Sequence, residues 1–411
     1  MSFSTLGLDS SLLDNLTRLG YAEPTLVQRE AIPAALAGGD LLVSSQTGSG
    51  KTAAFVLPGL QRLRTAGTLP GKGPRMLVLT PTRELAMQVQ KATHGYCSGQ
   101  KLLTACLVGG VAFGKQLAQV SKPVDIVIAT PGRLKDHMDR GSVDLERVEL
   151  LVLDEADRML DMGFQEELDA IVARAPKNRQ TLLFSATLAG VVGRLASRVT
   201  RNPKRIEIAQ REETRPDITQ HALIADNEAH KGRMLDSLLR ETEVEQALVF
   251  TATKRSAAEL TLSLVAKGFT AGALHGDMQQ KDRTRTLNQL REGRMRVLVA
   301  TDVAARGIDV PGINLVVNYD APRQAQDYVH RIGRTGRAGR SGIAVTFLGH
   351  ADRNLVRQIE RFTGNKVSLM EIAGLEPRAR RERTPDPGRG WSAGPWRPQG
   401  REARPGRRFS R

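Results

Sequence analysis

Three groups of residues in this sequence have the types and spacing that phosphate chemistry requires. The first is the glycine-rich run at residues 48–52, which follows an apolar stretch and precedes the apolar start of a helix. In such a loop, backbone N–H groups hold phosphates, Lys51 reaches the terminal phosphates and Thr52 binds Mg²⁺. Ser45 stands where this loop usually has glycine. A glycine-rich turn without a ligand is the plainer alternative for this run alone.

The second group is acidic and follows the apolar residues 150–153. Asp154 can hold Mg²⁺ through water, and Glu155 can orient or deprotonate the water that attacks a phosphate. An ordinary acidic helix start is the alternative, since the helix dipole favours acids in a first turn. The glycine-rich loop in the same half of the chain favours the hydrolytic interpretation.

The third group lies in the second half and is basic. His330 is followed by Arg331, Arg334 and Arg337, which stand three residues apart among glycines. Arginine directed at the developing charge of a γ-phosphate acts as an arginine finger. Neither half should then hydrolyse ATP well alone. A basic loop that only binds a phosphate backbone is the alternative.

The elements that must position these groups form an alternating pattern of strands and helices. Short apolar runs predict strands buried on both faces, and the stretches between them, such as 83–92 and 164–175, have helical spacing. The fold class is therefore α/β with doubly wound parallel sheets, which bind ligands beyond the carboxyl ends of their strands. The predicted strands are 41–44, 76–80, 126–130, 150–154 and 182–185, then 247–251, 271–274, 297–301, 315–319 and 343–348.

The two halves are similar to each other. The segment 77–83 resembles 248–254, and 128–130 resembles 299–301, with the same offset of 171 residues in both pairs. A shared offset suggests a duplicated domain. We predict a first domain at 1–209, a linker at 210–217, a second domain at 218–375 and a tail at 376–411.

The composition and net charge limit the classes of partner that the protein can have. The chain has 411 residues, 40% hydrophobic and 25% charged, with a net charge of +16. No apolar run approaches the roughly 18 residues that cross a bilayer, and residues 1–11 do not resemble a signal peptide, so we expect a cytoplasmic protein. The charge favours nucleic acid over a membrane. Cys97 and Cys106 fit neither a redox nor a zinc motif, so we expect them to be reduced.

The tail at 376–411 is rich in Arg, Gly and Pro, with eleven Arg against four acidic residues. Such a stretch cannot bury enough apolar surface to order itself, so we predict disorder. Its Trp391, Trp396 and Phe409 could stack on bases while Arg meets phosphate, which makes an RNA tether the preferred interpretation. A solubilising tail is the alternative.

From residue 3 to about residue 348 the chain resembles the DEAD-box RNA helicases, which have two RecA-like domains. The motifs that carry the resemblance are, in order, Gly20-Tyr21 through Pro24-Thr25 to Gln28; Ser45 through Thr52; Pro81 through Leu85; Gly109-Gly110; Thr130 through Arg133; Asp154 through Asp157; Ser185-Ala186-Thr187; His275-Gly276-Asp277 with Gln280 and Arg283; Thr301-Asp302 through Arg306 to Asp309; and His330 through Arg337. Ten such matches in the family's order are not accidental.

The resemblance implies a role for each matched residue. Gln28 would read the adenine edge of ATP and Tyr21 would stack on its face, beside the loop residues Ser45, Gln46, Thr47, Gly48, Ser49 and Gly50. Asp309 would bond the ribose, and Arg334 and Arg337 would be the fingers. Ser185, Thr187 and His330 would couple hydrolysis to RNA binding. One RNA strand would contact Pro81, Thr82, Arg83, Gly109, Gly110, Thr130, Gly132, Arg133, Thr251, Gly276 and Thr301.

The implied activity is RNA-dependent hydrolysis of ATP with Mg²⁺, coupled to strand bending and local unwinding. An ATP-gated RNA clamp or scaffold is an alternative, and so is a DNA helicase, which the 2′-OH would distinguish. We expect a monomer, with ribosomal or RNA-decay proteins as partners. Tyr21, Val27 and Ser45 depart from the family's commonest residues without threatening activity. The first eight residues, the insert-free core and the Arg-rich end resemble the bacterial RhlE-type branch.

Overall fold

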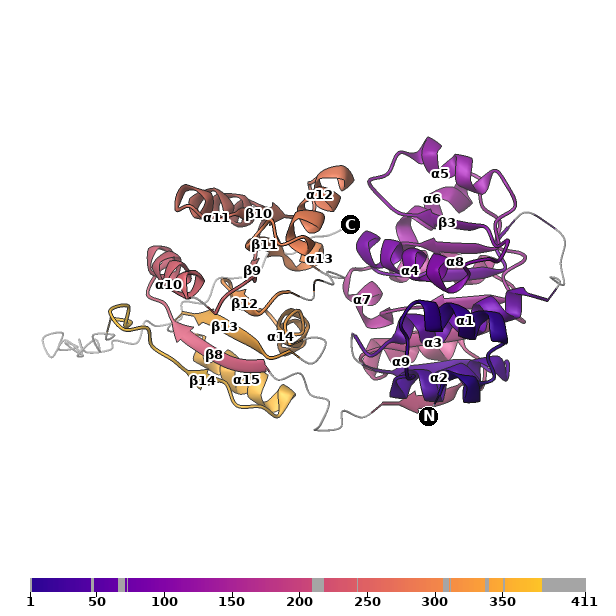
Figure 1. Ribbon diagram of the computed structural model, residues 1–411, viewed down its shortest axis with the longest axis horizontal. Coiled ribbons are helices and arrows are strands. Elements are labelled where there is room, and N and C mark those ends of the chain that lie inside the picture. Colours follow the sequence, from indigo (N-terminus) through magenta and orange to yellow (C-terminus); the bar gives the residue numbers. More distant parts are fainter. Residues whose placement is uncertain are drawn as a thin grey trace, which may run out of the picture.

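The computed structural model describes residues 2–45, 48–65, 71, 73–208, 218–241, 243–305, 310, 312–336, 340–349 and 352–378. Two α/β units lie side by side along the chain (Figure 1). The predicted linker and the tail beyond residue 378 lie outside the described residues. The domain boundaries and the tail's disorder therefore stay predictions.

The first unit contains residues 3–207 and is built around one sheet. Its elements are η1 (Phe3–Leu6), α1 (Ser10–Arg18), α2 (Leu26–Leu36), β1 (Leu41–Ser44), α3 (Lys51–Leu63), β2 (Met76–Leu79), α4 (Arg83–Tyr96), β3 (Thr104–Leu107), α5 (Phe113–Val120), β4 (Ile126–Ala129), α6 (Pro131–Asp139), β5 (Leu150–Leu153), α7 (Ala156–Asp161), α8 (Gln165–Arg174), β6 (Gln180–Ser185), α9 (Gly190–Val199) and β7 (Lys204–Glu207).

The second unit contains residues 218–369 and is built around another sheet. Its elements are β8 (Ile218–Ile224), α10 (Glu228–Arg240), β9 (Ala247–Thr251), α11 (Lys254–Ala266), β10 (Ala271–Leu274), α12 (Gln280–Arg291), β11 (Val297–Thr301), α13 (Asp302–Ala305), β12 (Leu315–Asn318), α14 (Ala325–Ile332), β13 (Gly342–Leu348), α15 (Arg353–Thr363) and β14 (Ser368–Leu369).

The two sheets share one topology, which confirms the predicted fold class. Each has seven strands, in the orders β3-β4-β2-β5-β6-β1-β7 and β10-β11-β9-β12-β13-β8-β14, and every pairing is parallel. Position by position, each strand of the first sheet has a counterpart in the second. The similar segments with the shared offset lie on β2 and β9 and on β4 and β11, so the repeated sequence occupies equivalent places.

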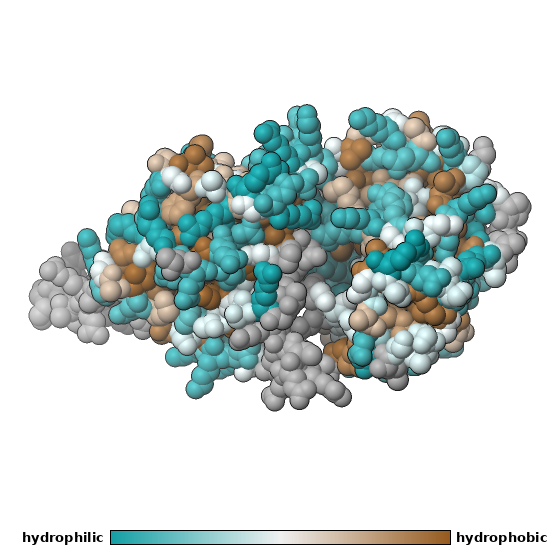
Figure 2. Space-filling view, in the orientation of Figure 1, coloured by the Kyte–Doolittle hydropathy of each residue, from teal (hydrophilic) through white to brown (hydrophobic). Residues whose placement is uncertain are grey.

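The central strands of each sheet are buried on both faces, as their apolar runs predict. In β1, Leu41 and Val43 belong to the core under α1 to α4, while Leu42 belongs to the core under α5 to α9. The second sheet is likewise packed on both sides. Hydrophilic residues cover most of the face shown in Figure 2, and apolar residues there form small, separate patches.

The segment 352–375 completes the second unit. It supplies α15, whose Ile359 is buried against Tyr328 of α14, and the short edge strand β14. Among the described residues, no helix is long and apolar enough to cross a membrane. Both cysteines are free thiols.

Candidate active site

The phosphate-loop residues lie between β1 and α3, at the carboxyl edge of the first sheet. Gly48 and Gly50 have φ angles of 84° and 91°, a region that favours glycine. Lys51 is buried, and its Nζ donates a hydrogen bond of 3.2 Å to the Ser45 carbonyl oxygen. The ammonium group is therefore held over the loop. Gln46 and Thr47 lie outside the described residues.

Gln28 connects this loop to the start of α2. Its Oε1 accepts a hydrogen bond of 2.9 Å from the Thr25 N–H, and its Nε2 donates one of 3.1 Å to the Gly50 carbonyl. A Cβ on Gly50 would lie 2.5 Å from that Nε2. The glycine therefore lets the glutamine reach the loop, and Gln28 is fixed beside the phosphate-binding residues.

We expect Gln28→Glu to weaken ATP and ADP binding about tenfold. A carboxylate cannot donate to the Gly50 carbonyl, and an unmade buried hydrogen bond costs roughly 1–3 kcal/mol. Titration calorimetry without RNA measures the change, with Gln90→Glu on α4 as the matched control. Equal nucleotide affinity in the Gln28 and Gln90 variants would contradict the role of Gln28.

Tyr21 is held at the side of the same unit by other aromatic residues. Its hydroxyl group lies 2.8 Å from the Tyr96 hydroxyl, and its ring meets those of Phe3 and Tyr96 edge-on at 6.3 and 5.8 Å. The ring nevertheless remains 38% exposed. Tyr21 therefore presents a fixed aromatic surface, and its stacking on adenine stays a prediction.

Asp154 follows β5 and is a buried carboxylate with one unpartnered oxygen among the described residues. It is 2% exposed, and its Oδ1 has no hydrogen-bond partner among the described residues. Burial raises the pKa of the Asp154 carboxyl group to about 7, although the Lys51 charge opposes the rise. An unpaired carboxylate oxygen near the phosphate loop suits a hard cation such as Mg²⁺. The half-buried Thr52 hydroxyl is the second predicted ligand.

Glu155 has a backbone conformation that non-glycine residues seldom adopt. Its φ and ψ are 52° and 53°, in the left-handed region, and it immediately precedes α7. Such strain costs of order 1–3 kcal/mol and tends to occur at functional sites. The residue before an ordinary helix has an extended backbone, so this conformation distinguishes Glu155 from a plain acidic helix start.

Asp157 joins the acidic segment to the end of β6. Its Oδ2 accepts a hydrogen bond of 3.1 Å from the Ala186 N–H, and its Oδ1 accepts one from the Arg158 N–H. The Thr187 N–H donates to the Ser185 hydroxyl over 3.3 Å. The segment 185–187 is thus positioned directly by the acidic group, as its predicted coupling role requires.

The predicted RNA contacts of the first unit gather beyond β2, β3 and β4. Thr82 caps α4, and its Oγ accepts the Leu85 N–H over 3.2 Å. Arg83 lies beside Gly109 and Gly110, close enough that a Cβ on either glycine would meet its guanidinium group. The predicted contact Arg133 lies in the first turn of α6 and donates to the Val111 carbonyl over 2.9 Å. These neighbours place Pro81, Thr130 and Gly132 at the same edge.

Gly110→Ala is expected to weaken RNA binding about tenfold while leaving nucleotide affinity without RNA unchanged. Gly110 has a φ of 76°, and its Cβ would displace Arg83. Left-handed backbone costs roughly 1–2 kcal/mol for other residues. Fluorescence anisotropy of a labelled single strand measures the loss. Gly114→Ala is the control, since nothing lies within 4 Å of its Cβ. Equal losses in both variants would refute the assignment.

The second unit repeats this edge. Thr251, which ends β9, donates from Oγ1 to the Thr253 carbonyl over 3.4 Å, and Thr80 donates to the Thr82 carbonyl over 3.2 Å. Thr253 caps α11 as Thr82 caps α4. Thr301 ends β11, and Gly276 follows β10. The predicted RNA contacts of both units therefore occupy equivalent strand ends.

The basic segment divides into arginines with different surroundings. Arg331 binds both carboxylate oxygens of Asp302 at 2.6 and 2.7 Å and also the Asn318 side chain, so it holds the unit together. Arg334 is buried and donates to the His330 carbonyl. His330 and Arg334 line a narrow cavity with Arg158 of the first unit. Arg337 and Asp309 lie outside the described residues.

A buried ion pair joins the two units. The Arg283 guanidinium on α12 donates two hydrogen bonds, of 2.8 and 2.6 Å, to Oε1 of Glu84 on α4. The Arg283 side chain is 6% exposed and the Glu84 side chain 5%. Burial, followed by the charge of Arg283, lowers the pKa of the adjacent Arg83. In Figure 1, α12 and α13 face α4 and α7. The two carboxyl edges therefore face each other.

Comparison with known proteins agrees with this geometry. Residues 25–195 match the DEAD/DEAH box helicase family, and 230–339 match the helicase conserved C-terminal domain. ATP-dependent RNA helicase DeaD of Buchnera aphidicola is 43% identical, over 90% of this chain and 61% of that protein. DEAD-box ATP-dependent RNA helicase CshA of Bacillus cereus is 41% identical, over 91% and 70%. This chain belongs to the DEAD-box ATP-dependent RNA helicases.

Solved DEAD-box structures have the same two-unit architecture. A Saccharomyces cerevisiae Dbp5 variant bound to RNA and ADP BeF3 is 34% identical, with a TM-score of 0.81 over 90% of this chain and 95% of that one. Mss116p bound to ssRNA and AMP-PNP is 29% identical, with a TM-score of 0.80 over 90% and 79%. The sequence relatives carry the names DeaD and CshA, and the narrower RhlE-type placement stays a prediction.

Sequence reasoning missed two features of this DEAD-box site. Arg331 belongs to the arginine spacing that suggested fingers, but its contacts with Asp302 make it a structural residue. Arg283 was noted only as part of a motif, and its partner Glu84 was not identified. The signal that could have found the pair is a charged residue in each of two motifs on opposite units.

Proposed function

We propose that this DEAD-box chain closes its two units around one RNA strand when ATP binds, and that closure bends the strand and separates short duplexes. The observation that carries the proposal is the Arg283–Glu84 pair, which joins the two edges where the nucleotide and RNA residues lie. Contacts with sugar and phosphate carry no base information, so RNA of many sequences would be bound.

The chemistry that we propose divides between the units. Lys51 would bind the terminal phosphates and Glu155 would orient the attacking water, while Arg334 from the second unit would meet the charge of the transferred phosphate. Asp154 and Thr52 would hold Mg²⁺, which supplies positive charge to the phosphates when it is bound. Because the groups come from both units, RNA would stimulate hydrolysis by favouring closure.

The test is steady-state ATP hydrolysis with no polymer, with a single-stranded RNA and with DNA of the same sequence, alongside displacement of a short RNA duplex. Strong stimulation by RNA alone, with displacement, supports the proposal. Equal stimulation by DNA would identify a DNA helicase. A long-lived complex with ATP and RNA but little displacement would identify a clamp.

We further propose that the chain works in the cytoplasm as a monomer, with ribosomal or RNA-decay proteins as partners. Its net charge of +16 supports a polyanionic partner, and the tail's Arg and Trp residues support a second, weaker hold on RNA. Removing residues 379–411 should then lower RNA affinity more at low salt than at high salt.

A further inference from the structure

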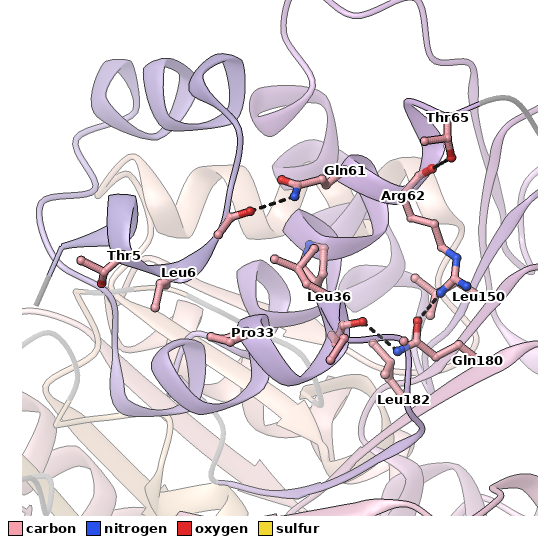
Figure 3. A pocket seen from close by; sticks show the side chains of 15 residues that line it. Thr5, Leu6, Pro33, Leu36, Gln61, Arg62, Thr65, Leu150, Gln180 and Leu182 are labelled. Atoms are coloured by element: carbon pink, nitrogen blue, oxygen red, sulfur yellow. Dashed lines mark hydrogen bonds between the residues drawn. The ribbon is translucent and has the colours of Figure 1, made fainter.

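A cavity of about 760 Å³ lies in the first unit, at the edge of the sheet where β5 and β6 begin. Its walls are η1 and the last turns of α2 and α3, and its floor includes Leu150 and Leu182 at the strand starts (Figure 3). This is the edge opposite to the phosphate loop. The volume is within the roughly 300–1,000 Å³ of small-molecule sites. We call it the rear cavity.

Four of the five elements around the rear cavity also carry residues of the nucleotide site at their other ends. Gln28 lies in the first turn of α2, and Lys51 begins α3. Asp154 follows β5, and Ser185 ends β6. Helices of 11 and 13 residues span roughly 15–20 Å. An occupant of the cavity would therefore press on the rigid elements that position the nucleotide residues.

The cavity wall mixes apolar side chains with polar groups, and the amide side chains among the polar groups are already engaged. Gln61 accepts the Asp9 N–H over 2.9 Å and donates to the Gly7 carbonyl over 2.8 Å. Gln180 donates to the Ala35 and Gly39 carbonyls at 2.9 and 2.7 Å. Neither amide would favour a polar ligand. The wall therefore offers its apolar side chains to the body of a ligand.

Arg62 is the exception among the cavity's polar groups. Its Nη1 donates to the Gln180 side-chain oxygen, and its Nε lies 4.0 Å from Glu149. Glu149 accepts two shorter bonds, of 2.7 and 3.1 Å, from Arg75, so Arg62 has the weaker contact. The Arg62 side chain is 37% exposed, and its Nη2 has no hydrogen bond among the described residues. One acceptor on a ligand would satisfy it.

We propose that the rear cavity binds a small amphipathic anion, with its apolar body between η1 and α2 and its anionic group on Arg62, and that occupancy changes nucleotide affinity through α2 and α3. The binding step stands independently of the proposed function. The effect on nucleotide affinity rests on one part of the proposed function, the nucleotide site of the first unit, and not on RNA-driven closure. By linkage, nucleotide must change the ligand's affinity by the same factor.

The probe is 8-anilinonaphthalene-1-sulfonate, which combines an aromatic body with a sulfonate, titrated by fluorescence against the full chain. Ala37→Trp fills the cavity from the exposed end of α2, and Thr5→Trp fills it from the opposite wall. We expect each to weaken binding at least tenfold, and Arg62→Gln to weaken it about fivefold. Arg194→Gln, an exposed arginine on α9, is the charge-matched control and should bind as the wild type does.

The second arm measures ADP binding by calorimetry with and without saturating probe. We expect a change of threefold or more in the ADP dissociation constant of the wild type, and none in Ala37→Trp. Wild-type probe binding in both tryptophan variants would overturn the site. If the tryptophan variants lost probe binding but the probe left the ADP affinity of the wild type unchanged, the coupling would be overturned. Failure of RNA to stimulate hydrolysis would instead count against the proposed function alone.

Discussion

Replacing Glu155 with glutamine is expected to lower kcat for RNA-stimulated ATP hydrolysis by about 10²–10⁴-fold, the usual contribution of a positioned proton-transfer group. Glutamine has nearly the same shape but cannot accept a proton from water. The Asp157 bonds that position the segment stay in place, at 3.0 Å to Arg158 and 3.1 Å to Ala186. ATP and RNA binding should therefore survive. Phosphate release in steady state, with nucleotide affinity measured in parallel, checks both statements.

The control for this substitution is Glu146→Gln, an exposed glutamate of the same unit. It removes the same charge at a position away from the nucleotide site and should hydrolyse ATP at the wild-type rate. If Glu155→Gln retained most of its turnover, another group would have to activate the water. If it lost ATP binding as well, the glutamate would have a structural role in the loop.

Much of the fold was predictable because its central strands are buried on both faces. The apolar runs at 76–79, 126–129 and 150–153 coincide with β2, β4 and β5. The edge strands β3 and β7 were not predicted, because their residues alternate or are exposed. In β7 only Ile206 is buried. A strand with one solvent-exposed face has no continuous apolar run, so its sequence does not predict it by that pattern.

The nucleotide half of the site was predictable for a related reason. Lys51, Asp154 and Ser185 each stand at the end of an element or within a few residues of one, so knowing the elements located the residues. The order of the strands in the sheet was not predictable from these runs. Because β5 and β6 are neighbours in the sheet, Asp157 contacts Ala186, although the two residues are 29 positions apart in the sequence.

The Arg283–Glu84 contact between the units could not be predicted from either helix alone. Glu84 stands in the first turn of α4, where an acidic residue has an ordinary explanation in the helix dipole. Arg283 is 199 residues away. Only the relative placement of the units shows that these two charges bury each other. A charged side chain whose position is explained by its own helix can thus also form an ion pair with the other unit.

Breaking that pair gives the second large effect that we expect. Arg283→Met should reduce the affinity for RNA in the presence of a non-hydrolysable ATP analogue by about 10²-fold. Removing one partner of a buried ion pair costs roughly 3–5 kcal/mol, because the remaining charge is uncompensated. The charge left uncompensated is that of Glu84 on the other unit, and the second unit also loses the hydrogen bonds of 3.1 and 3.3 Å from Arg283 to its own His275 and Ala304 carbonyls. RNA-stimulated hydrolysis should fall with closure, while each unit stays folded.

Two further variants separate closure from simple loss of charge. Arg285→Met, on the exposed side of the same helix, removes one positive charge and should cost little. Exchanging the charges, with Glu84→Arg and Arg283→Glu together, should recover part of what either substitution loses alone. Fluorescence transfer between dyes on the two units would report closure directly. An Arg283→Met variant that closed on RNA and ATP as the wild type does would show that the pair is a contact without consequence, and the closing force would have to come from the nucleotide and RNA residues themselves.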